Sequence, residues 1–467
     1  LLFSYVGYLS RELKVSELPS TIKLEEDAQT LQEVVVVGYG TQKKANLSGA
    51  VTAIEGEKIS SKPSANVLSA LQGEMPGVTV LRSGGEPGSE TSGLRIRGFS
   101  SANSTSALVL IDGVEGDMTL LNTNDIASIS VLKDAAACAI YGARAAAGVV
   151  LITTKSGMEG KPRVSYNGYV GFNTPGNMPE RLPAWEEQVM INESRIQANG
   201  TPEWSPEQTS WVGNPNFNFR PNNKNGRWDF FEATNWVEEG TRHFTTQQNH
   251  SVSVTGGRKE LTYLVSAGYY TKNGILKYGP DGNDRYNLRM KINSELNKHI
   301  NLNILASYEG KFVENNPYGA RNILGRLYRV RGRQPIFNPE EDSNENPYNG
   351  DLQVNAIDLM KNGGIAKSQY EAFTGKGELT VKDYIKGLKL KLSASRKAGY
   401  YSSTVKRRTL QWYDRVGKSI RFQVNNPNEM SRQKNNDYHD TFDAVLTYDL
   451  TLGKQVLNFL AGTSYER

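Results

Sequence analysis

The sequence has few of the residues that several common protein classes require. A single cysteine, Cys138, excludes an intramolecular disulfide and any cysteine-rich metal site. Only four histidines are scattered along the 467 residues, so we expect neither a metal site nor a metal cofactor. The formal net charge of +5 is too small to indicate a nucleic-acid-binding protein. No nucleophile–base pair stands out, and we therefore expect a protein that is not an enzyme.

Long apolar runs are also missing. No stretch approaches the ~18 consecutive apolar residues of a transmembrane helix, and apolar runs such as residues 34–37 and 148–152 are short. The mean hydropathy is −0.53. These features exclude a helical membrane protein. They do not exclude a membrane β-barrel, because barrel strands alternate apolar and polar residues and average to a hydrophilic composition.

Three regions of the chain differ in composition. Residues 1–33 hold short strand-like pieces and an acidic connector. Residues 34–160 are rich in glycine, alanine, serine and valine, whereas residues 161–467 are rich in tyrosine, asparagine, lysine and arginine. The middle region reads as a compact α/β domain, with strand patterns separated by loops of small polar residues.

The third region shows the period-2 alternation of β-strands. In one of the clearest windows Ile300, Leu302 and Ile304 alternate with asparagines. The pattern predicts nine strands, at approximately 163–172, 245–255, 260–272, 285–296, 300–312, 370–382, 388–401, 441–452 and 456–466.

Short and long connections alternate between these strands. The longest predicted loops are 173–244, 313–369 and 402–440. Short turns at one end and long loops at the other are typical of outer-membrane barrels. A soluble β-sandwich, the alternative, would use Greek-key crossovers and has no reason to keep this asymmetry.

Aromatic residues lie at the long-loop ends of the predicted strands, among them Phe172, Tyr269, Phe312 and Tyr400. This is the position of an interfacial girdle that contacts outer-membrane lipid. Nine strands would leave two open edges, and an open edge in lipid costs several kcal/mol per unsatisfied backbone group. We therefore expect further strands beyond Arg467 in the complete protein.

Several motifs of the middle region carry a resemblance to a known family. Residues 63–78, 94–98, 111–114 and 131–157 resemble, in order and spacing, the plug domain of the SusC/RagA-like TonB-dependent transporters. Residues 31–40 resemble the TonB box of that family. Residues 1–26 resemble the closing strands of the small carboxypeptidase-regulatory-like domain that often precedes it.

The resemblance implies a fold and a domain order. The fold is an all-β outer-membrane barrel, with 22 strands in the full protein and about nine here, an N-terminal α/β plug domain and a β-sandwich remnant. The implied domains are a regulatory-like remnant (1–26), a linker with the TonB box (27–42), the plug (43–160) and the first barrel strands (161–467).

The resemblance also implies a function. The expected activity is import of oligosaccharides across the outer membrane of a Gram-negative cell of the Bacteroidota, driven by TonB with ExbB and ExbD. A SusD-like lipoprotein is the expected surface partner. Three alternatives stay open: a peptide importer of the same family, a siderophore receptor, against which the plug motifs argue, and a non-transporting adhesin, which would have no use for a TonB box.

The TonB box must be an extended segment to which a periplasmic partner can add a strand. The four consecutive valines have the β-propensity for this pairing, and the glycines after them keep the connection flexible. The alternative is a buried core strand. The predicted box comprises Glu33, Val34, Val35, Val36, Val37, Gly38, Tyr39 and Gly40.

Three arginines of the plug, Arg95, Arg97 and Arg144, are predicted to contact the barrel. They could pair with carboxylates of the inner wall and hold the plug until TonB pulls. The alternative is that they only support the plug fold.

Loop residues are the predicted contacts for cargo, since hydroxyl and amide groups hydrogen-bond sugars and indole rings stack on them. The alternative for the tryptophans is a small core inside a long loop. The predicted substrate-facing residues are Gly84, Gly85, Phe99, Asn103, Thr105, Trp185 and Trp412.

Overall fold

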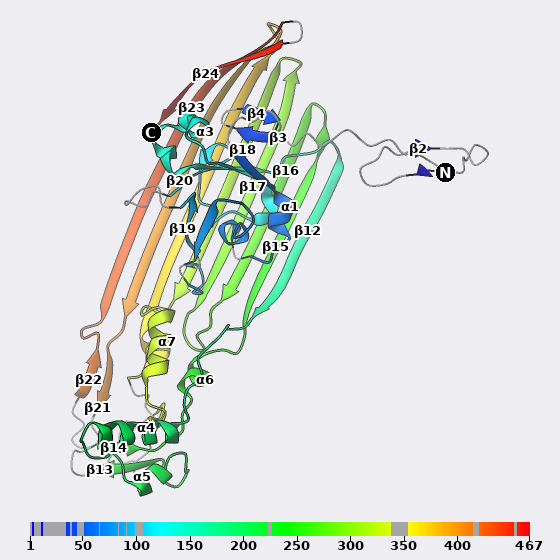
Figure 1. Ribbon diagram of the computed structural model, residues 1–467. Coiled ribbons are helices and arrows are strands. Elements are labelled where there is room, and N and C mark those ends of the chain that lie inside the picture. The colour runs from blue at the N-terminus through cyan, green and yellow to red at the C-terminus, as the bar shows by residue number, and fades with distance from the viewer. Residues whose placement is uncertain are drawn as a thin grey trace, which may run out of the picture.

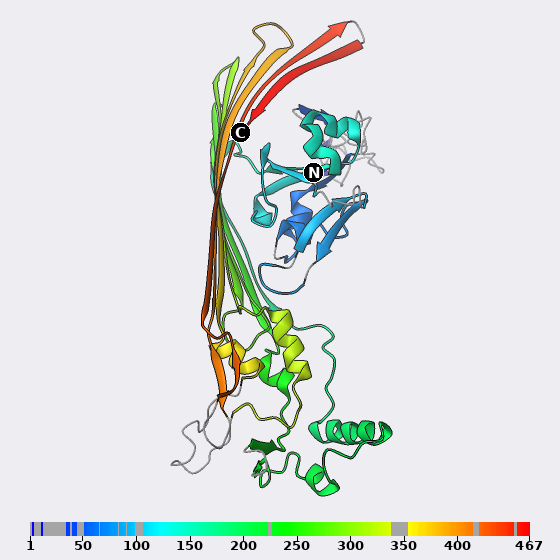
Figure 2. The same cartoon turned by 90° about the vertical axis from the view of Figure 1, so that its left-hand side faces the viewer.

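The computed structural model describes residues 2–3, 11–12, 34–37, 40–43, 51–64, 66–82, 84–89, 91–98, 106–222, 227–337, 354–413, 420–452 and 455–467. Within these ranges one large antiparallel sheet curves past a smaller α/β unit, which lies against one of its faces (Figures 1 and 2). We call the large sheet the wall and the α/β unit formed by residues 51–154 the plug.

The wall has nine strands in sequence order, each antiparallel to its neighbour, so all nine predicted strands are present. They are β12 (Gly160–Asn173), β15 (Thr245–Arg258), β16 (Leu261–Asn273), β17 (Gly282–Asn297), β18 (Ile300–Asn315), β19 (Gly364–Lys382), β20 (Leu388–Arg407), β23 (Glu429–Leu452) and β24 (Gln455–Glu466).

Two of the predicted loops are wrong in their limits. The loop predicted at 402–440 overlaps β20 and β23, which pair from Arg407 with Glu429 onwards. The loop predicted at 313–369 likewise loses residues to β18 and β19. Residues 429–440 are almost entirely polar, so both faces of this part of β23 lack the apolar alternation that marks the other strands. Backbone hydrogen bonds to β20 nevertheless extend β23 through these residues, for which the side-chain pattern predicts a loop.

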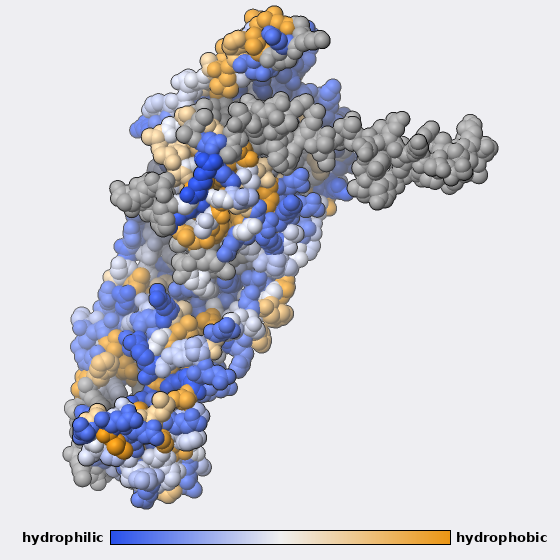
Figure 3. All heavy atoms as spheres, in the orientation of Figure 1, coloured by the Kyte–Doolittle hydropathy of each residue, from blue (hydrophilic) through white to orange (hydrophobic). Residues whose placement is uncertain are grey.

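The two faces of the wall differ as alternation requires. Leu288 stands opposite Ala267 and Tyr308 on the exposed outer face, while Arg289 stands opposite Ser266 and Ser307 on the face toward the plug. The side of the molecule that carries the plug is largely hydrophilic (Figure 3).

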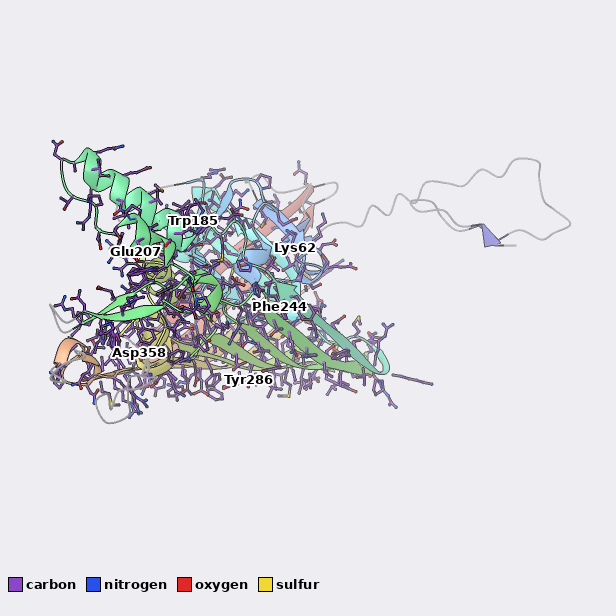
Figure 4. All side chains as sticks on the ribbon, turned by 90° about the horizontal axis from the view of Figure 1, so that it is seen from below. Lys62, Trp185, Glu207, Phe244, Tyr286 and Asp358 are labelled. Carbon is purple, nitrogen blue, oxygen red and sulfur yellow. The ribbon has the colours of Figure 1, made fainter. Side chains whose placement is uncertain are left out.

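Aromatic rings line the outer face near its long-loop end. Tyr269, Tyr286 and Phe312 contact one another in series, tilted and then edge-on, with centroids 5.1 and 5.8 Å apart, and Tyr286 projects from the outer surface (Figure 4). The neighbouring Tyr270 is instead buried, with the Arg285 guanidinium 5.0 Å from its ring centroid. Of the two adjacent tyrosines, Tyr269 therefore belongs to the aromatic girdle of the outer face and Tyr270 does not.

The plug has its own apolar core, formed between a mixed sheet and short helices. Ile59, Leu71, Ile126, Ile129 and Val150 are fully buried in it. The sheet order is β5 (Val51–Glu55), β10 (Ile126–Leu132), β11 (Val149–Thr154), β8 (Leu108–Ile111), β9 (Val114–Glu115), with a separate hairpin of β6 (Val78–Arg82) and β7 (Thr91–Ile96). The helical segments are α1 (Gly56–Ser60), α2 (Val67–Ala70), η3 (Thr123–Asp125), α3 (Ala135–Cys138) and η4 (Ala139–Ala147).

The long connections gather at one end of the wall, beyond the plug (Figure 2). Trp236, Leu276, Ile323, Leu327 and Ile357 are buried together there. We call the elements at this end the loop module: α4 (Ala184–Gln197), α5 (Pro206–Ser210), β13 (Phe219–Asn222), β14 (Arg227–Phe230), α6 (Trp236–Gly240), α7 (Ala320–Arg329), α8 (Ala356–Asn362), β21 (Leu410–Tyr413) and β22 (Ile420–Val424).

Near the N-terminus, β1 (Leu2–Phe3) pairs with β2 (Arg11–Glu12), and β3 (Val34–Val37) pairs with β4 (Gly40–Lys43). The rest of the predicted regulatory-like remnant at 1–26 lies outside the described residues. None of the helices in the described ranges is long and apolar enough to cross a membrane.

Candidate functional site at the plug–wall interface

A tight turn of the plug carries Asp112. Strands β8 and β9 pair through Ile111 and Val114, which leaves Asp112 and Gly113 as a two-residue hairpin loop. Both have positive φ, 51° and 83°. This is the conformation for which Asp-Gly is favoured, since Gly has no Cβ and Asp tolerates the left-handed region. The turn places the Asp112 carboxylate against the wall.

The Asp112 carboxylate joins three elements. Its Oδ1 accepts hydrogen bonds from Lys291 Nζ of β17 at 2.8 Å and from Thr154 N of β11 at 3.0 Å. Its Oδ2 accepts from the Thr154 hydroxyl at 2.7 Å and from Arg289 Nη1 at 3.3 Å. Arg289 Nη2 in turn donates to Glu309 of β18 at 2.9 Å. We call Asp112, Arg289, Lys291 and Glu309 the ion cluster.

The ion cluster is buried and balanced in charge. The Arg289 and Lys291 side chains are 3% and 9% exposed, and the two carboxylates 11% each. Burial by itself acts to raise the pKa of Asp112, but the charges of Lys291 and Arg289 outweigh it and hold the pKa below its ordinary value. Asp112 is therefore ionised at neutral pH. Removing one partner of a buried pair costs about 3–5 kcal/mol, because the other charge stays uncompensated.

Six further contacts across the interface share one pattern, in which a wall side chain donates to a backbone carbonyl of the plug. Such bonds position the plug without a shared apolar core. They are Arg285 to Thr119 (3.2 Å), Asn287 to Leu120 (2.6 Å), Lys311 to Gly88 (2.6 Å), Lys376 to Asp112 (2.7 Å), Lys397 to Glu115 (3.1 Å) and Tyr169 to Ser64 (3.4 Å).

A loop of the plug, residues 84–89, also reaches the loop module. Glu86 Oε1 accepts a hydrogen bond from the Ala320 backbone N–H, at the start of α7, at 3.3 Å. Nearby, Asp281 accepts from the Leu276 N–H at 2.8 Å, while its Oδ1 is buried without a hydrogen-bond partner. Burial raises the pKa of Asp281 to about 6, the Leu276 bond opposes this shift, and the charge of Glu86 adds to it.

The three predicted plug arginines have different surroundings. Arg144 of η4 lies 3.1 Å from Glu115 of the plug and 2.6 Å from Glu466 of β24. Arg97 lies 2.8 Å from Asp134, within the plug itself. Arg95 lies in β7 opposite Thr79 of β6. More deeply buried in the interface are two arginines of the wall, Arg285 and Arg289, each 3% exposed, and neither is among the predicted contacts.

The sequence held a signal for this cluster. Asp112 belongs to the 111–114 motif, and Arg289 and Lys291 occupy consecutive polar positions of the predicted strand 285–296. Two cations on the inner face of one strand indicate a buried acidic partner, because an unpaired buried charge is costly. The partner itself could not be chosen from the sequence.

The other predicted site residues are only partly described. Val34–Val37 form β3 and Gly40 begins β4, whereas Glu33, Gly38 and Tyr39 lie outside the described residues. Among the predicted substrate-facing residues, Gly84 and Gly85 are exposed. Trp185 is 51% exposed on α4, and Trp412 stands opposite Phe422 in the β21–β22 hairpin. Phe99, Asn103 and Thr105 lie outside the described residues.

A cavity of about 400 Å³ lies beside the ion cluster, between plug and wall. Its lining is rich in charged residues, among them Asp112, Lys291, Lys376, Glu378 and Lys391. Within the described ranges, no group of three or more histidine, cysteine, aspartate or glutamate residues is placed to hold a metal ion.

Comparison with known proteins decides the family. Residues 43–149 match the TonB-dependent receptor plug domain. The chain is similar to TonB-dependent receptor P26 of Formosa agariphila, with 33% identity over 353 residues. It is also similar to TonB-dependent receptor SusC of Bacteroides thetaiotaomicron, with 33% identity over 363 residues. The chain belongs to the SusC/RagA-like TonB-dependent transporters.

The solved structures agree in fold. The RagAB peptide importer in its open–open state is 23% identical, with a TM-score of 0.72 over 93% of this chain and 49% of that chain. In its closed–closed state the TM-score is 0.70 over 90% of this chain and 48% of that chain. These figures show that the wall and plug have the arrangement of a TonB-dependent barrel.

The chain spans about a third of the length of these curated relatives: the P26 and SusC alignments each cover 74% of this chain but 33% and 32% of those proteins. The family consists of receptors and transporters of the Gram-negative outer membrane, and this transporter is accordingly an outer-membrane protein. The outer face of the wall, with its aromatic girdle, is the face toward lipid.

Asp112→Asn tests the ion cluster. The amide keeps an oxygen for Thr154 but removes the charge that compensates Lys291 and Arg289, and we expect the plug–wall contact to weaken by about 3 kcal/mol. Hydrogen exchange of residues 108–115 should quicken, and cells should admit large hydrophilic antibiotics more readily. Arg97→Gln is the matched control, because its partner Asp134 lies in the plug and both are partly exposed. Equal hydrogen-exchange protection of residues 108–115 in the Asp112→Asn and Arg97→Gln variants would rule out a role of Asp112 in anchoring the plug.

Asp281 predicts a pH dependence. Its raised pKa means that stabilisation by the protonated carboxyl is fully present below the ordinary value of about 4 and is lost as pH rises through about 6. We expect residues 274–281 to lose roughly 2–3 kcal/mol of local stability between pH 4 and 7. Hydrogen exchange, corrected for the intrinsic rate, measures this. Asp281→Asn should remove the dependence, and an unchanged pH profile in that variant would contradict the assignment.

Proposed function

We propose that the complete protein imports oligosaccharides across the outer membrane, driven by TonB with ExbB and ExbD. The observation that carries the proposal is the polar character of the plug–wall interface. The apolar cluster that fills the centre of the plug consists of plug residues alone. Many of the contacts with the wall are ion pairs and hydrogen bonds, centred on Asp112. A plug built in this way can move against the wall without losing its own core.

The cavity beside the ion cluster supports a gating role. Once the plug shifts, water would hydrate the charged side chains that line the cavity. This hydration would offset the ion pairs that the side chains lose with one another. Breaking the Asp112 contacts would then widen a hydrophilic passage along the inner wall. Cargo rich in hydroxyl groups could follow such a passage without meeting an apolar barrier.

The TonB contact is assigned to β3. A two-stranded hairpin leaves the outer edge of β3 without a strand partner in the described sheets. Strand addition at a free edge provides main-chain hydrogen bonds along which a partner can pull. Force applied at Val34–Val37 would reach the first strand of the plug, β5, through the residues between them.

A SusD-like lipoprotein is the proposed surface partner. Helix α4 projects from the loop module at the end far from the short turns (Figure 1). Trp185, Val189 and Ile196 are exposed there and recur at helical spacing along one side of it. An exposed apolar stripe of this kind is typical of a surface that another protein covers. The proposal includes no catalytic step and no cofactor.

Peptides, siderophores and adhesion are the rival functions, and one uptake experiment separates them. Cells that express the complete gene product are offered labelled oligosaccharides, peptides and a ferric siderophore in parallel. Energy-dependent accumulation of oligosaccharide supports the proposal. Accumulation of peptide or siderophore instead, or binding without accumulation of any of the three, would each replace it.

Deleting residues 34–40 should abolish uptake while surface binding of cargo persists, because the deletion removes the strand that TonB pairs with and leaves the wall intact. Val35→Pro is a sharper version, since proline has no N–H to donate and blocks strand pairing. Val35→Thr keeps both the backbone donor and the β-branched side chain, and should import normally. Normal uptake by the Val35→Pro variant would contradict the assignment of β3 as the TonB contact.

A further inference from the structure

Helix α7 has two unlike faces. Ala320, Ile323 and Leu327 are buried in the loop module. Arg321 and Arg329 are exposed, and Gly325 lies midway between them. Residues four apart follow one another along the same side of a helix. Arg321, Gly325 and Arg329 therefore form a single stripe, which we call the arginine face.

The segment around α7 is strongly basic. Residues 316–337 include five arginines and no aspartate or glutamate. Two of the five are used inside the module, since Arg331 and Arg333 lie 2.9 and 3.9 Å from Glu203. Among the residues that the structure describes, neither Arg321 nor Arg329 forms an ion pair; Arg329 Nε donates to the Gly325 carbonyl at 2.9 Å.

Gly325 is unexplained by the fold. A glycine inside a helix costs about 1 kcal/mol relative to alanine. Its φ is not positive, and a Cβ at this position would meet only Arg329 Nη2, at an ordinary contact distance of 3.6 Å. Neither backbone conformation nor packing requires it. Its effect is to let the Arg329 side chain lie close over the helix backbone, with Nε on the Gly325 carbonyl, so that the guanidinium is held on the same side of α7 as Arg321.

The arginine face lies near the plug, at the long-loop end. Helix α7 is on the same side of the wall as the plug (Figure 2). Its first N–H donates to Glu86 of the plug loop, and its last carbonyls accept hydrogen bonds from Arg181 at 2.8 and 2.5 Å. Both ends of the helix are thus held, and the exposed side is presented as a fixed surface at the long-loop end of the wall.

We propose that the arginine face binds an acidic oligosaccharide, one that carries carboxylate or sulfate groups. Guanidinium groups bind such oxyanions through two parallel hydrogen bonds. Asn322, also exposed on α7, provides amide donors and an acceptor for hydroxyl groups. The inference rests on the proposed import of oligosaccharides and narrows their class to anionic ones.

The test measures binding by the complete gene product in detergent. The ligands are matched sets of neutral, uronate-containing and sulfated oligosaccharides, together with an acidic peptide. Hydrogen bonds to charged groups are strong enough that Arg321→Ala with Arg329→Ala should weaken binding of the acidic sugars about tenfold or more. Binding of neutral sugars should not change. Added salt should weaken only the acidic ligands.

Three further variants separate binding from folding. Gly325→Ala should fold at least as well as the parent and still weaken acidic sugars, because its methyl group meets the Arg329 guanidinium. Arg321→Lys with Arg329→Lys keeps the charge but not the paired donors, and should retain part of the affinity. Arg195→Ala is the control, because Arg195 is half exposed but already paired with Glu203, and it should bind like the parent.

The outcomes are distinct. Neutral sugars that bind as tightly as acidic ones, with the arginine variants unaffected, overturn this inference and leave oligosaccharide import standing. Binding of the acidic peptide but of no sugar overturns both this inference and the proposed cargo class. Selective loss of acidic sugars in the arginine and Gly325 variants supports both.

Discussion

The arrangement of this transporter depends on one buried carboxylate. Asp112 is held by a hairpin turn of the plug and compensates two cations of the wall, Lys291 and Arg289, that would be costly to bury alone. The cations in turn stand on the inner face of β17 because alternation sends its apolar side chains to the opposite side. The hairpin turn of the plug, the strand register of the wall and the balance of charge therefore together determine the contact at Asp112. This contact holds the plug against the wall.

This seating differs in kind from the packing within each part. The plug and the loop module each enclose an apolar cluster, and such clusters resist partial opening because every buried side chain shares many neighbours. Ion pairs and hydrogen bonds across an interface can instead be exchanged for water one by one. Ion pairs and hydrogen bonds therefore suit the attachment of a domain that moves against its neighbour better than an apolar core does. Glu86 extends the same chemistry to α7, so the plug is also joined to the loop module at the long-loop end of the wall.

Much of the fold was predictable because its signals are local. Alternation in β17 or β18 appears in any ten residues of their sequence, and the wall follows from such windows taken together. A strand with polar residues on both faces lacks the alternation of apolar and polar residues. The first half of β23 is such a strand, and its sequence therefore predicts a loop. In the plug, α3 ends at Cys138 and the chain continues as the 3₁₀ segment η4, within which Gly142 adopts a φ of 68°.

The sequence by itself determined the family, the order of plug and wall, and which side of each strand is apolar, because these depend on motifs and on a spacing of two residues. Only the tertiary structure decided the site. Asp112 and Lys291 lie far apart in the chain, and their pairing depends on how a hairpin and a curved sheet meet in space. The arginine face has the same origin. Its arginines are visible in the sequence, but only burial of Ile323 and Leu327 decides which side of α7 remains for a ligand.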